Sequence, residues 1–396
     1  MSVKIAYLYD LKIFPPKGGN HVHALELVKG FVAAGHEVAV VEDETAPGVT
    51  NFLDTRETLK DLMAWCDVLY VRVDARSLRE WGALNTCYKH KGSVAIVWEV
   101  NSPASETLAY SYYGGMEHWD RQQETMVRKL KRLLHVAKKI PSIWREERYR
   151  KSIAKEVSAA VCVSSSMRNY ARDYLNIENS LVVPNGAVPF SRDEIDARMV
   201  VKTARPFTVL YSGSAIYPWQ GLNYLSEVAA IARKKTPDIR FLIVVNQLTE
   251  AVPQGENIEV RVGMARDELM SEICRADICL SIQPEFFWSR WKFHGSPMKL
   301  FEYMACGTLV LASNIGQMSE LIQDGVNGLL CESEPESIFN KIMLAHNHPR
   351  EKEEMAFEGW KLVNEELNWV RNVEHTIELF NSVTSQKTES KVTNSL

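Results

Sequence analysis

The sequence predicts an α/β protein made of two doubly wound domains, each with a parallel sheet. The 396 residues are too many for one ordinary core, and 46% hydrophobic with 24% charged residues is typical of globular domains. Short apolar runs alternate with helix-like segments, which favours parallel strands joined by helices. This alternation stops in the polar stretch AVPFSRDEIDARMVVKTAR and restarts at FTVLYSGS, so a second domain is expected from near Pro206.

The elements of both domains follow the same rhythm. The first domain opens with strand VKIAYLY, glycine-rich loop PPKGGN, helix HVHALELVKGFVAAG and strand HEVAVVED, which together form a βαβ unit. Further strands are expected in DVLYVRV, SVAIVWEV, AAVCVS and NSLVVPNGA, and in the second domain in FTVLYSGS, IRFLIVVN, DICLSI and GTLVLAS. We expect domains at 1–190 and 191–365, a helix at 366–381 that crosses back to the first domain, and a disordered tail at 382–396.

Charge, cysteine content and hydropathy exclude several classes of protein. A net charge of -4 gives no overall attraction to nucleic acid. The seven cysteines are scattered and never form a Cys-x-x-Cys pair, so neither a disulfide framework nor a zinc site is predicted. The sequence shows no signal-peptide pattern and no run of eighteen apolar residues. A cytoplasmic protein is expected, with peripheral contact at the inner face of a membrane left open.

A lysine and a glutamate lie three residues apart in GSPMKLFEYMACG, where a helix is predicted over 297–306 with Ser296 as its N-cap. Lys299 and Glu302 would share one helix face. Free N–H groups at the helix start, beside the lysine, suit a phosphate, and a carboxylate one turn on can accept hydrogen bonds from a ribose diol. For an isolated pair, a surface salt bridge would be the commoner explanation.

The surrounding sequence favours the nucleotide site. The pattern SPxKLFEYMACGxxVLAS…GxxxELIxDGxNGLL resembles the donor-site signature of the family 4 glycosyltransferases. The segments KGGNHVHALELVKGFVAAGHEV, VVPNGA, RADICLS and WEVNSPASE resemble further motifs of that family in the same order. The resemblance covers nearly all of residues 3 to 380. It implies the GT-B fold, two doubly wound Rossmann-like domains facing across a cleft, and a retaining sugar transfer.

The resemblance also implies residues for the donor. Lys299 and Glu302 would act in catalysis, Gly18 and Gly19 would approach the donor phosphates, and a plain strand-to-helix turn remains the alternative for this Gly-Gly pair. Asn185 would serve as a hinge or line the cleft, with equal weight. The donor-binding residues expected in full are Gly18, Gly19, Asn185, Gly213, Ser214, Gln220, Gly263, Arg290, Lys292, His294, Pro297, Met298, Lys299, Leu300 and Glu302.

Two positions depart from the family pattern. Gln220 stands where members usually carry a lysine, and His294 stands where the first glutamate of Glu-x7-Glu is usual. Arg290 or Lys292, in the loop before the donor helix, would supply the missing positive charge. No Asp-x-Asp occurs in the sequence, so metal-independent catalysis without a cofactor is expected, with a nucleotide-diphosphate sugar as the donor substrate.

Acceptor-binding candidates cluster at the same rim of the first domain. Glu99 and Asn101 lie at the end of a predicted strand, and carboxyl ends of strands line the crevice in open α/β sheets. Glu99 is expected to orient an acceptor hydroxyl, which makes it the third catalytic candidate. His21 and His23 follow the Gly-Gly loop and are acceptor candidates, although solvated histidines are common at helix starts.

A basic segment spans residues 121–155. It holds twelve Lys or Arg against three Glu, interleaved with apolar residues such as Leu130 and Trp144. This pattern fits an amphipathic helix pair that faces anionic lipid or a phosphorylated acceptor. A solvated charged face packed on the sheet by its apolar side explains it equally well.

The predicted function is transfer of a hexose-type sugar from a nucleotide sugar to a glycan, a lipid-linked glycan or a small hydroxylated acceptor. Gln220 and His294 leave one alternative open, a GT-B-like pseudoenzyme that binds a partner. A nicotinamide dehydrogenase ranks far lower, because PPKGGNHVH lacks Gly-x-Gly-x-x-Gly.

Overall fold

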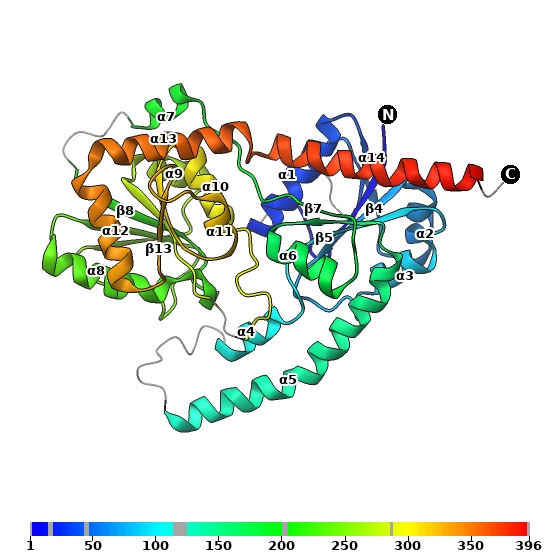
Figure 1. Cartoon of the computed structure of the whole chain (residues 1–396), viewed down its shortest axis with the longest axis horizontal. Coiled ribbons are helices and arrows are strands. Elements are labelled where there is room, and N and C mark those ends of the chain that lie inside the picture. Colours follow the sequence, from blue (N-terminus) through cyan, green and yellow to red (C-terminus); the bar gives the residue numbers. More distant parts are fainter. Residues whose placement is uncertain are drawn as a thin grey trace.

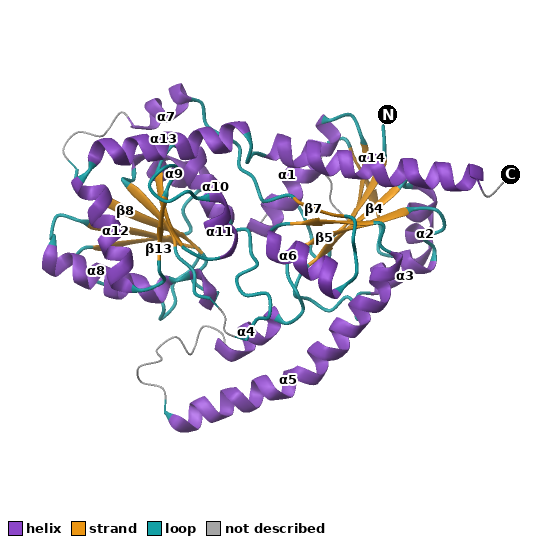
Figure 2. Ribbon diagram, in the orientation of Figure 1, coloured by secondary structure: helices purple, strands orange, loops and turns teal. Residues whose placement is uncertain are grey.

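The computed structural model describes residues 2–14, 19–42, 47–113, 125–199, 205–285 and 288–393. They form two parallel sheets, one from each half of the chain, and each sheet lies between helices (Figures 1 and 2). The predicted class, two parallel-sheet α/β domains, is therefore confirmed. Among the described residues, no helix is both long enough and apolar enough to cross a membrane.

The first sheet has seven parallel strands in the order β3-β2-β1-β4-β5-β6-β7. Its strands are β1 (Lys4–Leu8), β2 (Glu37–Val41), β3 (Val49–Phe52), β4 (Val68–Val73), β5 (Ala95–Val100), β6 (Ala159–Cys162) and β7 (Ser180–Val182). Its helices are α1 (Gly19–Ala33), α2 (Arg56–Trp65), α3 (Gly82–Lys89), α4 (Glu106–Tyr113), α5 (Met126–Ile153) and α6 (Ser165–Asn169). Every residue of β4 and β5 is buried, as expected for central strands covered on both faces.

The second sheet has six parallel strands in the order β10-β9-β8-β11-β12-β13. Its strands are β8 (Thr208–Gly213), β9 (Arg240–Val245), β10 (Ile258–Val262), β11 (Ile278–Ser281), β12 (Leu309–Ser313) and β13 (Leu329–Cys331). Its helices are α7 (Arg192–Met199), α8 (Leu222–Lys235), α9 (Arg266–Arg275), α10 (Met298–Ala305), α11 (Gly316–Leu321), α12 (Pro335–Asn347) and α13 (Pro349–Glu365).

Both sheets reverse their strand order next to their first strand, between β1 and β4 and between β8 and β11. Ligands of open α/β sheets bind beyond the carboxyl ends of the strands at such a switch point. Gly213 is the carboxyl end of β8. The segments that follow β5 in the first sheet and β11 in the second sheet also leave their sheets at the carboxyl ends of the strands. The topology thus places the candidate residues after β5 and β8 where a ligand is expected.

The chain crosses between the domains twice at one place. Ala187, in the first crossing, forms a parallel bridge with Asn368, in the return crossing. A Cβ at Gly186 would lie only 2.7 Å from the Asn368 carbonyl carbon, so glycine permits this close approach. The Asn372 side chain also donates a hydrogen bond to the Pro184 carbonyl, 2.6 Å away.

The last helix, α14 (Trp369–Thr393), packs on the first domain. Phe380 contacts the rings of Phe31 and Tyr70, with centroids 5.7 and 5.1 Å apart, and Val373 lies against Gly30 of α1. The helix continues past residue 381, so the disordered tail predicted for residues 382–396 is wrong for 382–393. This stretch contains neither Gly nor Pro, and extending a helix that is already packed costs little.

Candidate active site

Helix α10, which carries the predicted donor residues, begins at the junction of the two domains. Its N-cap is Pro297, one residue later than predicted, and Ser296 does not cap it. The Ser296 hydroxyl instead accepts a hydrogen bond from the Asn185 amide at 2.9 Å, and its carbonyl accepts one from the Asn185 side chain at 2.6 Å. The predicted cap is wrong because Ser296 accepts hydrogen bonds from Asn185 of the interdomain Pro-Asn-Gly segment instead of from the backbone amides of its own helix.

The N-terminus of α1, the first helix of the first domain, lies next to the N-terminus of α10. A Cβ at Gly19, the first residue of α1, would lie 3.5 Å from the Met298 side chain, the first residue of α10. Two helix starts with free N–H groups therefore meet across the domain junction. This arrangement produces a positive potential that suits the diphosphate of a donor.

Three polar atoms converge on Gly213 at the carboxyl end of β8. A Cβ at Gly213 would lie 2.7 Å from the Tyr211 hydroxyl, 2.9 Å from Lys299 Nζ and 3.1 Å from Gln220 Oε1. All three atoms are buried, and none has a hydrogen-bond partner among the described residues. Buried polar groups are normally satisfied, so this cluster is arranged for a ligand with complementary donors and acceptors.

Lys299 is the charged member of the Gly213 cluster. Its side chain is buried, and its ammonium lies over the Tyr211 ring, 4.1 Å from the centroid. Burial lowers the pKa of the Lys299 ammonium to about 7, against an opposing effect of the Glu302 carboxylate. A phosphate bound at Gly213 would therefore stabilise a cation whose burial in the protein alone is costly.

The pH dependence of stability should expose this cost. Between the folded-state pKa of about 7 and the unfolded value of about 10, the unfolded chain binds more protons, so stability rises with pH in this window. We expect Lys299→Met to be more stable than wild type at pH 7 and this difference to shrink toward pH 9.5. Melting temperatures of both proteins across the range measure it, and a constant difference would contradict it.

Glu302 lies one turn after Lys299 on α10. Its carboxylate pairs with Arg266 of α9 at 2.9 Å, where Glu302 is 14% exposed and Arg266 is 60% exposed. The arginine extends into solvent, so a ribose diol could take its place on the carboxylate without leaving the Arg266 charge buried. Arg266 was not predicted, because nothing in the sequence near α9 marks it as part of the donor region.

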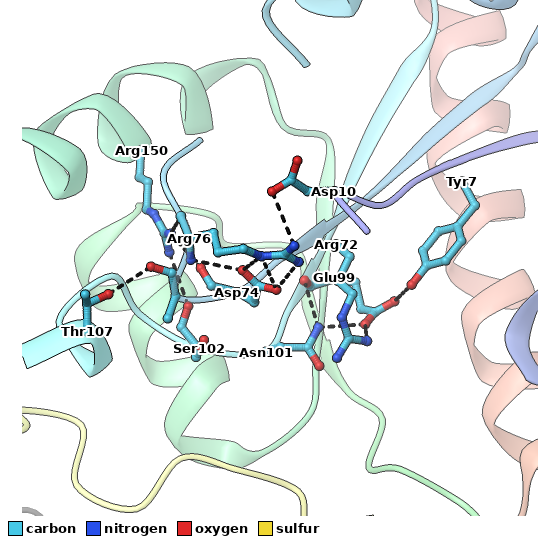
Figure 3. Close-up of polar contacts among 11 residues, drawn as sticks. Tyr7, Asp10, Arg72, Asp74, Arg76, Glu99, Asn101, Ser102, Thr107 and Arg150 are labelled. Atoms are coloured by element: carbon cyan, nitrogen blue, oxygen red, sulfur yellow. Dashed lines mark hydrogen bonds and ion pairs between the residues drawn. The ribbon is translucent and has the colours of Figure 1, made fainter. Parts of the chain in front are cut away.

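Glu99 occupies the centre of a buried polar network in the first domain (Figure 3). Its Oε1 accepts hydrogen bonds from Arg72 at 2.5 Å and Asn101 at 2.6 Å and lies 2.9 Å from His23 Nε2, and its Oε2 accepts one from Tyr7 at 3.0 Å. Burial would raise the pKa of this carboxyl, but the charges of His23 and Arg72 outweigh it and hold the pKa well below its usual range.

This geometry assigns Glu99 a different part from the predicted one. Glu99 is 1% exposed and both its oxygens already accept hydrogen bonds, so it positions His23 and Arg72 and is poorly placed to orient an acceptor hydroxyl. His23 is 3% exposed, and its Nδ1 lies 2.6 Å from Asn185 Oδ1. The network therefore runs from Glu99 through His23 and Asn185 to Ser296, at the start of the donor helix.

The loop before α10 is bound to the first domain. His294 is buried, its Nε2 lies 3.4 Å from Glu106 Oε2, and its carbonyl accepts a hydrogen bond from Ser164 at 2.6 Å. Burial lowers the pKa of His294, but Glu106 outweighs burial and the net pKa is raised. Trp291 of this loop packs on Tyr170, with ring centroids 5.5 Å apart.

The structure does not bring the two predicted substitute cations to the Gly213 cluster. Arg290 stacks on the Trp291 ring, 4.9 Å from its centroid, and Lys292 pairs with Glu285 at 3.7 Å. Lys292 has a φ of +51°, a left-handed conformation that is unusual for lysine. Their predicted role over the phosphates therefore requires the loop to rearrange.

Five predicted residues remain to be placed: Gly18, His21, Ser214, Gly263 and Leu300. Gly18 lies outside the described residues. Leu300 of α10 is buried in the hydrophobic core of the second domain. Ser214 follows Gly213, and its hydroxyl accepts a hydrogen bond from the Ile216 amide. Gly263 follows β10 with a φ of +65°, and the His21 ring lies edge-on to Tyr9, 6.3 Å between centroids.

Two participants in these networks, Tyr211 and Arg72, were not predicted from the sequence. Tyr211 is one of a series of apolar residues in β8, and Arg72 lies in a strand whose other residues are apolar or aromatic. A charged residue inside a fully buried strand is itself a usable signal, because such a residue needs a buried partner. Among the described residues, no group of three or more His, Cys, Asp or Glu is arranged to hold a metal ion.

Two parallel-sheet domains with this strand order define the GT-B fold, and solved glycosyltransferases share it. Sucrose-phosphate synthase from Thermosynechococcus elongatus has a TM-score of 0.64 and 16% identity, over 97% of this chain and 100% of that one. Anabaena HepE, in complex with UDP and glucose, has a TM-score of 0.62 and 15% identity, over 96% and 100%. The GT-B fold predicted from the resemblance is confirmed.

Sequence comparison finds a family model that matches part of the second domain. Residues 206–347 match the family model described as Glycosyl transferases group 1, and this range holds the Gly213 cluster and α10. The α-maltose-1-phosphate synthase of Mycolicibacterium smegmatis is 25% identical over 259 residues, which cover 57% of this chain and 64% of that protein. The chain thus spans less than two thirds of the length of the curated relatives it matches.

Proposed function

We propose that this protein is a retaining glycosyltransferase that moves a hexose-type sugar from a nucleotide-diphosphate sugar to a hydroxylated acceptor. The observation that carries the proposal is the Gly213 cluster, where Lys299, Tyr211 and Gln220 present buried polar atoms without hydrogen-bond partners. The cluster lies at the switch point of a domain that matches the Glycosyl transferases group 1 model. HepE, which shares the fold, is described with UDP and glucose bound.

In the proposed mechanism the protein stabilises the leaving group. The sugar bond breaks with negative charge developing on the diphosphate, and Lys299 with the converging helix starts of α1 and α10 neutralises that charge. Glu302, one turn on, accepts hydrogen bonds from the ribose diol. A metal ion is not required for either task, and retention of the anomeric configuration follows the resemblance. The acceptor would be a glycan, a lipid-linked glycan or a small hydroxylated molecule.

The direct test is hydrolysis and transfer with a panel of nucleotide sugars, with and without a chelator. Release of the nucleoside diphosphate from at least one donor, unaffected by the chelator, is expected. A chain that binds nucleoside diphosphates but releases none from any donor would support the GT-B-like pseudoenzyme instead. Retention is read from the anomeric configuration of the product by NMR.

Gln220→Lys is expected to increase donor affinity. A Cβ at Gly213 would lie 3.1 Å from Gln220 Oε1 and 2.9 Å from Lys299 Nζ, so the two side chains approach Gly213 about equally closely. A lysine at position 220 would therefore place a second cation beside the diphosphate. We expect KM for the donor to fall about tenfold, the effect of one charge-assisted hydrogen bond. Gln323→Lys, an exposed position after α11, makes the same change in charge away from the cluster and should leave KM unchanged. Equal KM values for Gln220→Lys and wild type would contradict the placement of phosphate at Gly213.

A further inference from the structure

Helix α5 has an exposed apolar face. Its 28 residues span about 40 Å at the helical rise, and it runs along the lower edge of the molecule in Figure 1. Its C-terminal part is anchored: Arg150 is fully buried and donates to the Glu146 carboxylate and to the Asp74 and Arg76 carbonyls. Between residues 126 and 145, only Val136 is buried.

The exposed residues form a continuous stripe. Successive members of the stripe are four, three, one, three, three and four positions apart along the chain. At 100° per residue these spacings keep all of them within an arc of about 120° around the helix. Its members are Met126, Leu130, Leu133, Leu134, Ala137, Ile140 and Trp144. All of them are exposed, and the six large ones are between 52% and 83% exposed. A surface of this size on a single helix indicates an interaction site.

The stripe is not the face by which α5 packs on the protein. Val136 and Arg150 lie on a different side of the helix, and Arg132 of that side covers the Tyr112 ring of α4, 4.4 Å from its centroid. The intramolecular contacts of α5 are therefore already made. The stripe remains outside them along about five turns of the helix.

The charges around the stripe select the partner. Residues 126–145 contain seven Lys or Arg and no Asp or Glu, and Lys129 borders one edge of the stripe while Lys138 and Arg145 border the other. A second copy of this helix would bring equal positive charges together, which opposes pairing between copies. An apolar stripe between cationic edges, with a tryptophan, fits the plane of an anionic lipid surface.

We propose that the stripe of α5 docks this protein on an anionic membrane surface, with the helix lying in the headgroup region. Leu130, Leu133 and Leu134 would enter the acyl boundary while the bordering lysines contact lipid phosphates. The anchoring of Glu146 and Arg150 fixes the helix to the first domain, so docking orients the whole chain. The inference goes beyond the proposed function, since it does not depend on sugar transfer.

Co-sedimentation with vesicles tests the proposal on the full chain. Wild type is expected to sediment with phosphatidylcholine vesicles containing phosphatidylglycerol, not with phosphatidylcholine alone, and to be released by high salt. Lys131→Glu/Lys138→Glu should weaken partitioning by about tenfold or more. Lys60→Glu/Lys234→Glu, both exposed on α2 and α8, makes the same change in net charge and should bind as wild type does.

A second pair of variants tests the apolar contribution. Leu130→Ser/Leu134→Ser should lose binding to a similar degree, whereas Leu248→Ser/Leu344→Ser, two exposed leucines elsewhere, should not. Because all seven cysteines are buried, Leu133→Cys can carry an environment-sensitive fluorophore, whose emission should shift to the blue on anionic vesicles. The same label at Leu344→Cys is the control.

The proposal is overturned by any of three results with chains that melt as wild type does. They are no sedimentation with anionic vesicles, equal loss of binding in the stripe and control variants, and a stripe-dependent dimer that does not bind vesicles. Nucleotide-sugar hydrolysis measured without vesicles is expected to be the same in all these variants. Loss of vesicle binding with intact hydrolysis therefore separates this proposal from the proposed enzyme activity.

Discussion

Replacing Lys299 by methionine is expected to remove most of the sugar transfer while leaving the folded chain at least as stable as wild type. The ammonium is buried with no hydrogen-bond partner among the described residues, so the cost of its burial outweighs its contacts with the Tyr211 ring and the Glu302 charge. Donor phosphates would supply that partner. Loss of a preorganised charge at a developing anion costs about 2–4 kcal/mol of transition-state stabilisation, a drop of roughly 30- to 1000-fold in turnover.

Lys352→Met is the matched control, because Lys352 is also largely buried but pairs with Asp277 at 2.8 Å. That variant should lose stability and keep its turnover, the opposite pattern. The measurements are kcat for donor hydrolysis and transfer, with melting temperatures at pH 7. Full turnover in Lys299→Met would show that the leaving group departs elsewhere and would remove the Gly213 cluster from the active site.

Glu99→Gln is expected to be among the most destabilising single substitutions at the site. The change leaves the Arg72 guanidinium, 6% exposed, beside a neutral amide in a buried network. Breaking a buried ion pair from one side costs about 3–5 kcal/mol. Glu302→Gln is the control, since its partner Arg266 is 60% exposed, and a pair in solvent contributes at most about 1 kcal/mol.

Hydrogen exchange at the β5 amides and the midpoint of chemical unfolding measure the effect of Glu99→Gln. The two variants should also differ in function. Glu302→Gln should raise KM for the donor. Glu99→Gln should reduce the fraction of folded protein, while the folded molecules that remain should keep most of their turnover. If Glu99→Gln folds as wild type does and loses only turnover, Glu99 would act on the substrate, as the sequence suggested.

Most of the strands that the sequence predicted correctly are buried, and the half-buried edge strand β7 was predicted as well. Apart from Arg72 in β4, Glu99 in β5 and the exposed Arg240 at the start of β9, the strands β4, β5, β9 and β12 are almost entirely apolar, because parallel strands covered on both faces need apolar side chains on both sides. The edge strands β3 and β10 were not predicted. Their residues are mostly half-buried or exposed, so neither alternation nor an apolar run marks them in the sequence.

The proximity of Lys299 and Glu302 on one helix was predictable for a local reason. Lys299, Glu302 and the helix that carries them lie within a few residues of each other, so spacing alone places them on one face. The Glu99 network joins β1, α1, β4 and β5 with a segment near residue 185, and no local pattern records contacts over such separations. Sequence placed Glu99 and His23 at the correct rim, but it could not show that they bind each other.

The bridge between Ala187 and Asn368 limits how the two domains can move. Two connections that were far apart would each have to stretch or fold during any large displacement. Here both connections pass through one point, where the backbones of Gly186 and Asn368 are in contact. A rotation about a line through that point leaves both connections at their present length, whereas sliding the domains past each other would pull on both. We therefore expect any change in the angle between the two domains to be a rotation about this point, which lies beside the start of α14, at the edge away from α5 (Figure 1).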